Sequence, residues 1–212
     1  MKKSNLERRN TQMPYVFDGE CAGDQVRAKE LLQKLNTTLP TDFPTIIPLV
    51  QELLGKSEGA YIHPPFHCNC GYNIETGKNF FANYGCVILD AAKVTIGDYC
   101  QMAPGVHIYT SGHPIHPASR NSGYEYAIPV TIGDNVWVGG NTVICPGVTI
   151  GSNTVIAAGS VVVDDIPDWV IAGGNPCRVI REITEEDRKY YYKDREFDNE
   201  AWEDMKSRGF AE

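Results

Sequence analysis

The chain has 212 residues, which is enough for one main domain with a substantial core and small additions at either end. Its formal net charge of −8 argues against a general nucleic-acid binder, because neutralising phosphates requires a broad Lys/Arg surface. No stretch approaches the length of a membrane span, and the basic start Met1-Lys2-Lys3 has no apolar core behind it, so we expect a cytoplasmic protein without a nucleic-acid or membrane partner.

The first 60 residues predict a helical cap. Apolar residues recur at helical spacing in two stretches, Val26, Leu31, Leu32 and Leu35, and then Ile46, Ile47, Val50, Leu53 and Leu54. The pair Thr41-Asp42 is a typical start for the second helix. We therefore expect residues 1–60 to form a helical domain ahead of the main fold.

Cysteine and histidine residues give no metal or disulfide pattern. The seven cysteines leave one unpaired in any closed disulfide scheme and form no CxxC pair, so we expect reduced thiols. The cluster His63, His67, Cys68 and Cys70 could imitate a zinc site, but its spacing fits no common finger or ribbon. We expect no metal requirement.

A six-residue period dominates the second half of the chain. Aliphatic residues recur at Ile132, Val138, Ile144, Ile150, Ile156 and Val162. An α-helix would not keep these positions on one face, because it has about 3.6 residues per turn. The period is typical of a parallel β-helix, in which each short strand points one large apolar side chain inward and glycine or asparagine forms the corners. Stacked coils share one core, and we expect them to span residues 61–183.

The same register begins upstream with one irregularity. Its in-phase residues are Ala82, Ile88, Ile96, Met102 and Ile108. Ile88 and Ile96 are eight residues apart rather than six, so we expect a two-residue bulge between those coils.

The series is interrupted between Ile108 and Ile132. The in-phase positions there are Pro114, Arg120 and Tyr126, and none of them fits a narrow aliphatic core. Glycine and proline are frequent in the same stretch. We therefore expect about residues 110–128 to form a loop extruded from the solenoid.

The last segment, residues 184–212, is rich in Glu, Lys, Arg and Tyr and predicts one or two exposed helices. The fold class expected for the chain is thus mainly β, a parallel β-helix between an N-terminal helical cap and a C-terminal helical tail.

Three motifs surround the hexapeptide run. They are Asn79-Phe80-Phe81-Ala82-Asn83, Thr110-Ser111-Gly112-His113-Pro114 and Ala172-Gly173-Gly174-Asn175-Pro176-Cys177-Arg178-Val179-Ile180-Arg181. Together they resemble the maltose and galactoside O-acetyltransferase family over about residues 15–192. The resemblance implies a left-handed β-helix assembled as a homotrimer, with acetyl-CoA in the groove between neighbouring subunits and a sugar as acceptor.

The resemblance assigns His113 as the catalytic base. A sugar hydroxyl is a poor nucleophile, and an imidazole, which titrates near neutral pH, can remove its proton as it attacks the thioester. Glu125, on the same expected loop, could orient His113, bind an acceptor hydroxyl or be a solvated charge. Asn83 matches a family residue at the reacting centre, where a neutral amide can donate to developing oxyanion charge.

The resemblance also assigns residues to both substrates. The acceptor-binding set is Asp18, Arg27, Asn69, Asn83 and Asp90, whose polar groups can form directional hydrogen bonds with sugar hydroxyls. The coenzyme-binding set is Trp137, Gly140, Ala158, Val163, Arg178 and Arg181, in which the arginines suit phosphates and the others line the pantetheine groove. Galactoside-type members have two adjacent acidic residues at the positions of Asp90 and Ala91, and a serine at the position of Asn69. These differences favour a maltose- or glucose-type acceptor for this chain.

Three alternatives stay open. A hexapeptide carbonic anhydrase would need three zinc-binding histidines, and the only candidates in the solenoid, His107, His113 and His116, are spaced unlike that family's. A non-catalytic hexapeptide scaffold would leave the retained His113, Asn83 and both arginines unexplained. The third alternative keeps the chemistry but uses a non-sugar acceptor, such as a xenobiotic or serine.

Overall fold

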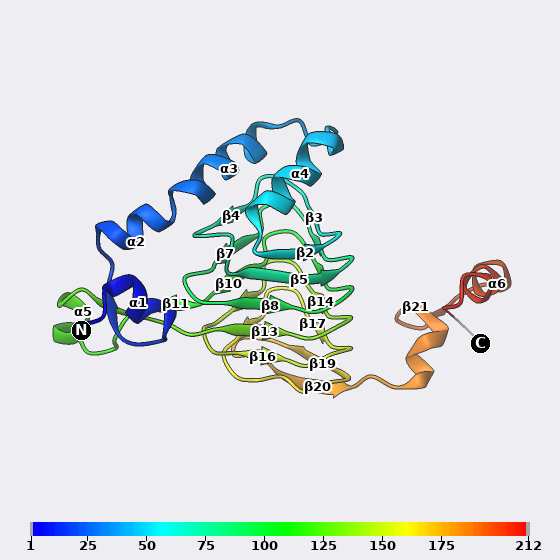
Figure 1. Cartoon of the computed structure of the whole chain (residues 1–212). Coiled ribbons are helices and arrows are strands. Elements are labelled where there is room, and N and C mark those ends of the chain that lie inside the picture. The colour runs from blue at the N-terminus through cyan, green and yellow to red at the C-terminus, as the bar shows by residue number, and fades with distance from the viewer. Residues whose placement is uncertain (1, 211–212) are drawn as a thin grey trace. The chain divides into compact units, whose positions relative to one another are not determined.

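The computed structural model describes residues 2–210, and the chain divides into two compact units between Arg181 and Glu182 (Figure 1). The first unit contains the N-terminal helices and the strands of the solenoid, and the second is a short C-terminal unit.

Four helices precede the solenoid. They are α1 (Asn5–Asn10), α2 (Gly19–Asp24), α3 (Val26–Thr37) and α4 (Phe43–Leu53). The predicted start of the second long helix is confirmed, because the Asp42 side chain accepts the backbone N–H of Thr45 at 3.3 Å. Two of the apolar residues in the predicted stretches, Val26 and Ile47, are exposed, whereas Leu35 and Val50 are fully buried. No helix within residues 2–210 combines the length and apolarity needed to cross a membrane.

The solenoid consists of three sheets, one for each side of its coils, and the strands of successive coils pair in parallel. The first contains β4 (His67–Cys68), β7 (Val87–Leu89), β10 (His107–Tyr109), β15 (Val143–Ile144) and β18 (Val161–Val162). The second contains β2 (Lys56–Glu58), β5 (Ile74–Lys78), β8 (Val94–Ile96), β13 (Val130–Ile132) and β16 (Thr149–Ile150). The third contains β3 (Tyr61–Ile62), β6 (Phe81–Ala82), β9 (Gln101–Met102), β14 (Trp137–Val138), β17 (Val155–Ile156), β19 (Val170–Gly173) and β20 (Arg178–Glu182). The predicted parallel β-helix with helical additions is confirmed.

The hexapeptide period sets the register of these sheets. Ile132 pairs with Ile150, and Ile144 pairs with Ile108, so the repeat residues stack directly on one another inside the coils. All of them are buried in one continuous core that extends to α3 and α4. The predicted bulge is also present: Ile88 pairs with Ile108 and Thr76 with Ile96, which leaves the two extra residues in the corner between β7 and β8.

Asparagine makes four of the corners. Asn79, Asn135, Asn141 and Asn153 have φ values of 54°, 55°, 56° and 58°, in the left-handed region that asparagine tolerates better than most residues. Neighbouring coils approach closely beside them, since a Cβ on Gly133 would lie 2.7 Å from the backbone nitrogen of Ser152. The glycines after the repeat aliphatics therefore allow the coils to stack.

The extruded loop is an ordered substructure. It contains β11 (Ser111–Gly112), α5 (Pro117–Asn121) and β12 (Tyr124–Ala127), and because Ile108 pairs with Ile144 it lies outside the ladders. Strand β12 pairs antiparallel with β11 on one side and with β1 (Tyr15–Val16) on the other. Figure 1 shows the N-terminal segment in blue beside this green loop. The chain's first strand thus holds a loop more than half the sequence away.

The C-terminal unit contains more than helices. It has a 3-10 turn, η1 (Glu185–Lys189), a hairpin of β21 (Tyr190–Tyr192) and β22 (Arg195–Glu196), and α6 (Asn199–Ser207). Asp198 caps α6 by accepting the backbone N–H of Ala201 at 2.8 Å. The predicted terminal helix is present, and the hairpin was not predicted.

Candidate active site

A polar cavity of about 310 Å³ lies where the N-terminal segment, the first coils and the extruded loop meet. Its lining residues are Arg9, Tyr15, Phe17, Gln25, Asn69, Ala91, Ser111, His113 and Glu125. Two of the residues expected at the reacting centre, His113 and Glu125, therefore share one cavity with the expected acceptor residue Asn69. The volume lies at the small end of the roughly 300–1,000 Å³ typical of small-molecule sites.

The loop hairpin places His113 in the cavity wall. Gly112 on β11 pairs with Tyr126 on β12, so His113 is the next residue beyond the ladder and stands opposite Glu125. A Cβ on Gly112 would meet the hydroxyl end of the Tyr126 ring, so a larger residue before the histidine would require that ring to move. His113 itself is exposed, so an acceptor can reach its imidazole.

Tyr15, on strand β1, lies on the other side of Glu125 from His113. It pairs with Glu125 in the β1–β12 ladder, and its hydroxyl donates to Oε2 of Glu125 at 2.9 Å. Burial, together with the hydrogen bond to the carboxylate, raises the pKa of Tyr15. The hydroxyl therefore keeps its proton and acts as the donor.

Asp90 supports the cavity from behind. Its side chain is fully buried, and its Oδ1 accepts the backbone N–H groups of Asn69 at 2.8 Å and Cys70 at 2.9 Å. Burial raises the pKa of Asp90 to about 6, against the lowering effect of these backbone hydrogen bonds. Its neighbour Ala91 lines the cavity in its place.

A buried ion pair anchors the N-terminal helices to the first coils. Arg9, only 1 % exposed, donates to Asp24 at 2.7 Å and to the hydroxyl of Tyr72 at 3.0 Å. Tyr72 in turn donates to Asp24 at 2.5 Å. Burial acts to raise the pKa of Asp24, but the hydrogen bonds from Tyr72 and Arg9 outweigh it and hold that pKa below its usual value. This cluster fixes Arg9 in the cavity wall.

Three other expected site residues lie outside this cavity. Asp18 caps α2, with Oδ1 accepting the N–H groups of Glu20 and Cys21 at 3.1 Å. Arg27 donates to the backbone carbonyl of Glu52. Asn83 follows β6, and because its Oδ1 accepts the N–H of Tyr84 at 2.8 Å, its NH₂ group is the one that can donate elsewhere.

The expected coenzyme residues lie on successive coils, also outside the cavity. Trp137 and Val163 are 56 % and 44 % exposed, and a Cβ on Gly139 would collide with the backbone of Ala158, which places that alanine against the strand of Trp137. Gly140 follows directly. Arg178 forms an exposed ion pair with Asp164 at 2.8 Å, and Arg181 is the last residue of this unit. Trp137, Ala158 and Val163 thus face solvent, and the two arginines belong to the strand that ends this unit.

Sequence reasoning missed Arg9, Tyr15, Phe17 and Gln25, which all come from the segment ahead of α3. The only local signal is the short run Tyr15-Val16-Phe17, whose aromatic and β-branched residues are typical of a strand. Its partner lies in the extruded loop, and no period in the sequence links the two.

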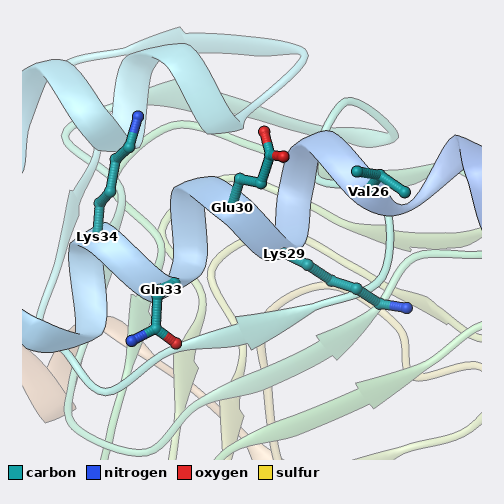
Figure 2. A pocket seen from close by; sticks show the side chains of 5 residues that line it. All are labelled: Val26, Lys29, Glu30, Gln33 and Lys34. Atoms are coloured by element: carbon teal, nitrogen blue, oxygen red, sulfur yellow. The ribbon is translucent and has the colours of Figure 1, made fainter.

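A second hollow, of about 550 Å³, lies along α3 and is lined by Val26, Lys29, Glu30, Gln33 and Lys34 (Figure 2). Figure 2 shows these side chains projecting from successive turns of the same helix. Charges of both signs alternate there, as on an ordinary solvated helix face. The smaller polar cavity is the better candidate because it brings together a base, a carboxylate and amides.

The histidines of the carbonic anhydrase alternative have separate roles. His107 Nδ1 lies 2.6 Å from the hydroxyl of Tyr109, and His116 Nδ1 accepts the N–H of Ala118 at the start of α5. Within the described residues 2–210, no three His, Cys, Asp or Glu side chains are grouped as a metal site, and this includes the cluster around His63 and Cys70.

Comparison with known proteins identifies the family. Residues 129–164 match the family model "Bacterial transferase hexapeptide (six repeats)". The chain is 43 % identical over 183 residues to the galactoside O-acetyltransferase of Escherichia coli, which covers 84 % of this chain and 90 % of the relative. It also resembles the crystal structure of a maltose O-acetyltransferase from Clostridium difficile 630, with 44 % identity, a TM-score of 0.84 and coverage of 86 % and 99 % of the two chains. A structure of galactoside acetyltransferase in complex with coenzyme A matches with 40 % identity, a TM-score of 0.89 and coverage of 93 % and 100 %.

These similarities extend over the helices, the solenoid and the extruded loop, and they confirm the resemblance carried by the three motifs. The chain belongs to the maltose and galactoside O-acetyltransferase family of hexapeptide-repeat, left-handed β-helix enzymes.

Proposed function

We propose that this protein transfers the acetyl group of acetyl-CoA to a hydroxyl group of a sugar, with His113 as the general base. The observation that carries the proposal is the position of the exposed His113 opposite Glu125 in a polar cavity of about 310 Å³. The family supports the same chemistry, since its named members are O-acetyltransferases and one has been seen with coenzyme A.

The proposed reaction is one displacement at the thioester carbonyl. His113 takes the proton of the acceptor hydroxyl while the oxygen attacks the carbonyl carbon, and the amide of Asn83 donates to the resulting oxyanion. Collapse of the tetrahedral intermediate breaks the carbon–sulfur bond, and the proton held by His113 goes to the departing thiolate. The products are the acetylated sugar and free coenzyme A, and no metal is required.

The cavity suits a neutral sugar acceptor. Its amides, Asn69 and Gln25, offer both donors and acceptors, as does the hydroxyl of Ser111. The charge of Arg9 is already paired with Asp24, so this wall does not favour an anionic ligand. With Ala91 where a second acid could stand, a maltose- or glucose-type acceptor is favoured. Asp90, behind the wall, holds the backbone of Asn69 in place.

Coenzyme A would lie along the strip formed by Trp137, Gly140, Ala158 and Val163. Backbone amides and small side chains leave room there for the narrow pantetheine arm, and the exposed arginines Arg178 and Arg181 suit the phosphates at its far end. None of these residues lines the cavity of His113, and we propose that the complete site combines this cavity with the strip of a neighbouring subunit.

A homotrimer provides that neighbour, and the outer faces of two of the sheets support it. One face carries exposed polar residues, such as Thr131 and Thr149, which suit solvent. A second carries the outward row His67, Val87, His107, Val143 and Val161, in which the three valines are only half-buried in one chain. Packing this row against another subunit would remove apolar surface from water. In such a trimer, Asp18 and Arg27 of one subunit would contribute to the acceptor site of its neighbour.

We place the reaction in the cytoplasm. All seven cysteines are free thiols, and six of them are buried, as expected for a chain that folds under reducing conditions.

An acceptor panel tests the proposed function. The purified chain is incubated with acetyl-CoA and maltose, glucose, a galactoside, serine or an aminoglycoside, and coenzyme A release and acetylated products are followed by chromatography and mass spectrometry. We expect the highest kcat/KM with a glucose-containing sugar. Faster turnover of serine or the aminoglycoside would move the acceptor to another class, and no release with any acceptor would contradict the acetyltransferase.

A further inference from the structure

Glu125 is held at one of its two carboxylate oxygens. Oε2 accepts the hydroxyl of Tyr15 at 2.9 Å, and Glu125 is half-buried in the cavity wall. Tyr15 is 1 % exposed and packs with Cys21, Ala91 and Ala127, so its ring cannot swing away without opening this small core. The position of the Glu125 carboxylate is therefore set by a rigid partner.

The three residues Tyr15, Glu125 and His113 form one row across a small sheet. Residues directly opposite in an antiparallel pair project to the same face, with Cβ atoms about 4.5–5.5 Å apart. Tyr15 is registered with Glu125, and the β11–β12 register, extended by one residue, brings Glu125 opposite His113. All three side chains line the same cavity. With Oε2 held by Tyr15, Oε1 is the oxygen that Glu125 can offer to His113 or to an acceptor hydroxyl.

We infer that Tyr15 is a positioning residue of the active site, which acts on the reaction by holding the Glu125 carboxylate, and that strand β1 is therefore part of the catalytic machinery. The effect on rate rests on the proposed function. The effect on the surroundings of the His113 ring does not, because it follows from the row alone.

A double-mutant cycle of Tyr15→Phe and Glu125→Gln tests this inference. Tyr15→Phe removes only the hydroxyl and keeps the buried ring, so the fold should survive, which circular dichroism checks. We expect it to lower kcat by roughly 3- to 30-fold with the KM for acetyl-CoA within about twofold. In the Glu125→Gln background, adding Tyr15→Phe should change kcat by less than about twofold, because the carboxylate that Tyr15 positions is already absent.

A matched control is Tyr190→Phe. Tyr190 also donates its hydroxyl to a carboxylate, that of Glu186, at 3.5 Å, and it belongs to the C-terminal unit and not to the residues that line the cavity. It should leave kcat within about twofold of wild type. An equal loss in both variants would show that the effect is not specific to the hydroxyl beside Glu125 and would overturn the inference.

The same cycle is read without any substrate by NMR of protein carrying ¹³C-labelled histidine, with the His113 ring signals assigned from His113→Ala. Tyr15→Phe should move these signals in the Glu125 protein and leave them unchanged in the Glu125→Gln background. If wild type transfers no acetyl group, the proposed function fails. The NMR measurement still tests whether Tyr15 positions Glu125 beside His113. The inference would be overturned if the two substitutions lowered kcat independently in the double variant. It would also be overturned if Tyr15→Phe left the His113 ring signals unchanged in the protein that retains Glu125.

Discussion

Oδ1 of Asp90 accepts the backbone N–H of Asn69 at 2.8 Å, while Oδ2 of the same buried carboxyl has no hydrogen-bond partner within the described residues. Asn69 lines the cavity, so this carboxyl supports a site it does not enter. A buried carboxylate with one unpaired oxygen is costly when charged, because water no longer solvates it. Burial accordingly raises the pKa of Asp90 to about 6.

Asp90→Asn should therefore change how stability depends on pH. In the folded chain the Asp90 carboxyl stays protonated up to about pH 6, whereas in the unfolded chain it ionises near 3.9. The stabilising effect of the neutral form is complete below about pH 4 and is lost as pH rises through about 6. The neutral amide avoids this loss. The free energy of unfolding of Asp90→Asn, relative to that of wild type, should therefore rise by about 1–3 kcal/mol between pH 4 and pH 7.5.

Denaturant unfolding of both proteins across that pH range measures the difference. Asp90→Ala is the control, since it removes the acceptor of both backbone N–H groups and should be less stable than Asp90→Asn at every pH. A constant difference between wild type and Asp90→Asn at all pH values would contradict the raised pKa.

The repeat core offers a stability prediction with an internal control. Ile144 is fully buried between Ile108 and Val162, whereas Ile115 on the extruded loop is 95 % exposed. Ile144→Ala should cost about 2–5 kcal/mol because it leaves a cavity between coils. Ile115→Ala should change the free energy of unfolding by less than about 0.5 kcal/mol. Similar losses in the two variants would show that the loop, and not the stacked coils, limits stability.

The sequence predicted those parts of the fold that repeat or stay local. The six-residue period predicted the coils and even the irregular corner after Ile88, because each coil stacks on its neighbour at a fixed offset. The antiparallel pairing of Tyr15 with Glu125 has no such period, since it joins two short strands 110 residues apart. The wall residues Arg9, Tyr15 and Phe17 were missed for that reason.

The limits of a local sequence pattern also explain why some of the expected site residues line the cavity and others do not. His113, Glu125 and Asn69 were expected together and line one cavity. Asp90 was expected to face the acceptor, and in the structure its short side chain is used by the backbone of the neighbouring coil. Which of two adjacent residues points inward at an irregular corner depends on the bulge geometry, and the residue types Asp90-Ala91 alone do not define it.

The arginines at the end of the coenzyme strip should affect binding more than chemistry. Arg178→Ala and Arg181→Ala should each raise the KM for acetyl-CoA more than they lower kcat, because phosphate contacts lie far from the thioester. Arg178 is 60 % exposed and its partner Asp164 is 66 % exposed, so the lost ion pair should cost little stability.

Steady-state kinetics with acetyl-CoA as the varied substrate gives this KM, and Arg188→Ala serves as the control. Arg188 forms a comparable exposed pair with Glu185 in the C-terminal unit, outside the proposed strip. If acetyl-CoA binds equally well to wild type, Arg178→Ala and Arg181→Ala, these two arginines do not belong to the coenzyme site.

Substitution of His113 tests the base directly. His113→Ala should lower kcat by roughly 10²- to 10⁴-fold, because the acceptor hydroxyl then attacks without proton removal. Affinity for acetyl-CoA, measured by calorimetry, should remain near that of wild type. The fold should also survive, because His113 is exposed on the extruded loop and its removal leaves no core cavity.

The control for this substitution is His67→Ala, which removes an exposed histidine of β4 that does not line the cavity. It should retain near-normal kcat. Glu125→Gln separates the two carboxylate roles left open by the sequence: orientation of His113 predicts a loss in kcat with every acceptor, whereas direct binding of an acceptor hydroxyl predicts a larger KM for the acceptor. If His113→Ala keeps most of its activity, another group removes the proton, and Glu125, the carboxylate opposite it in the same cavity, becomes the candidate base.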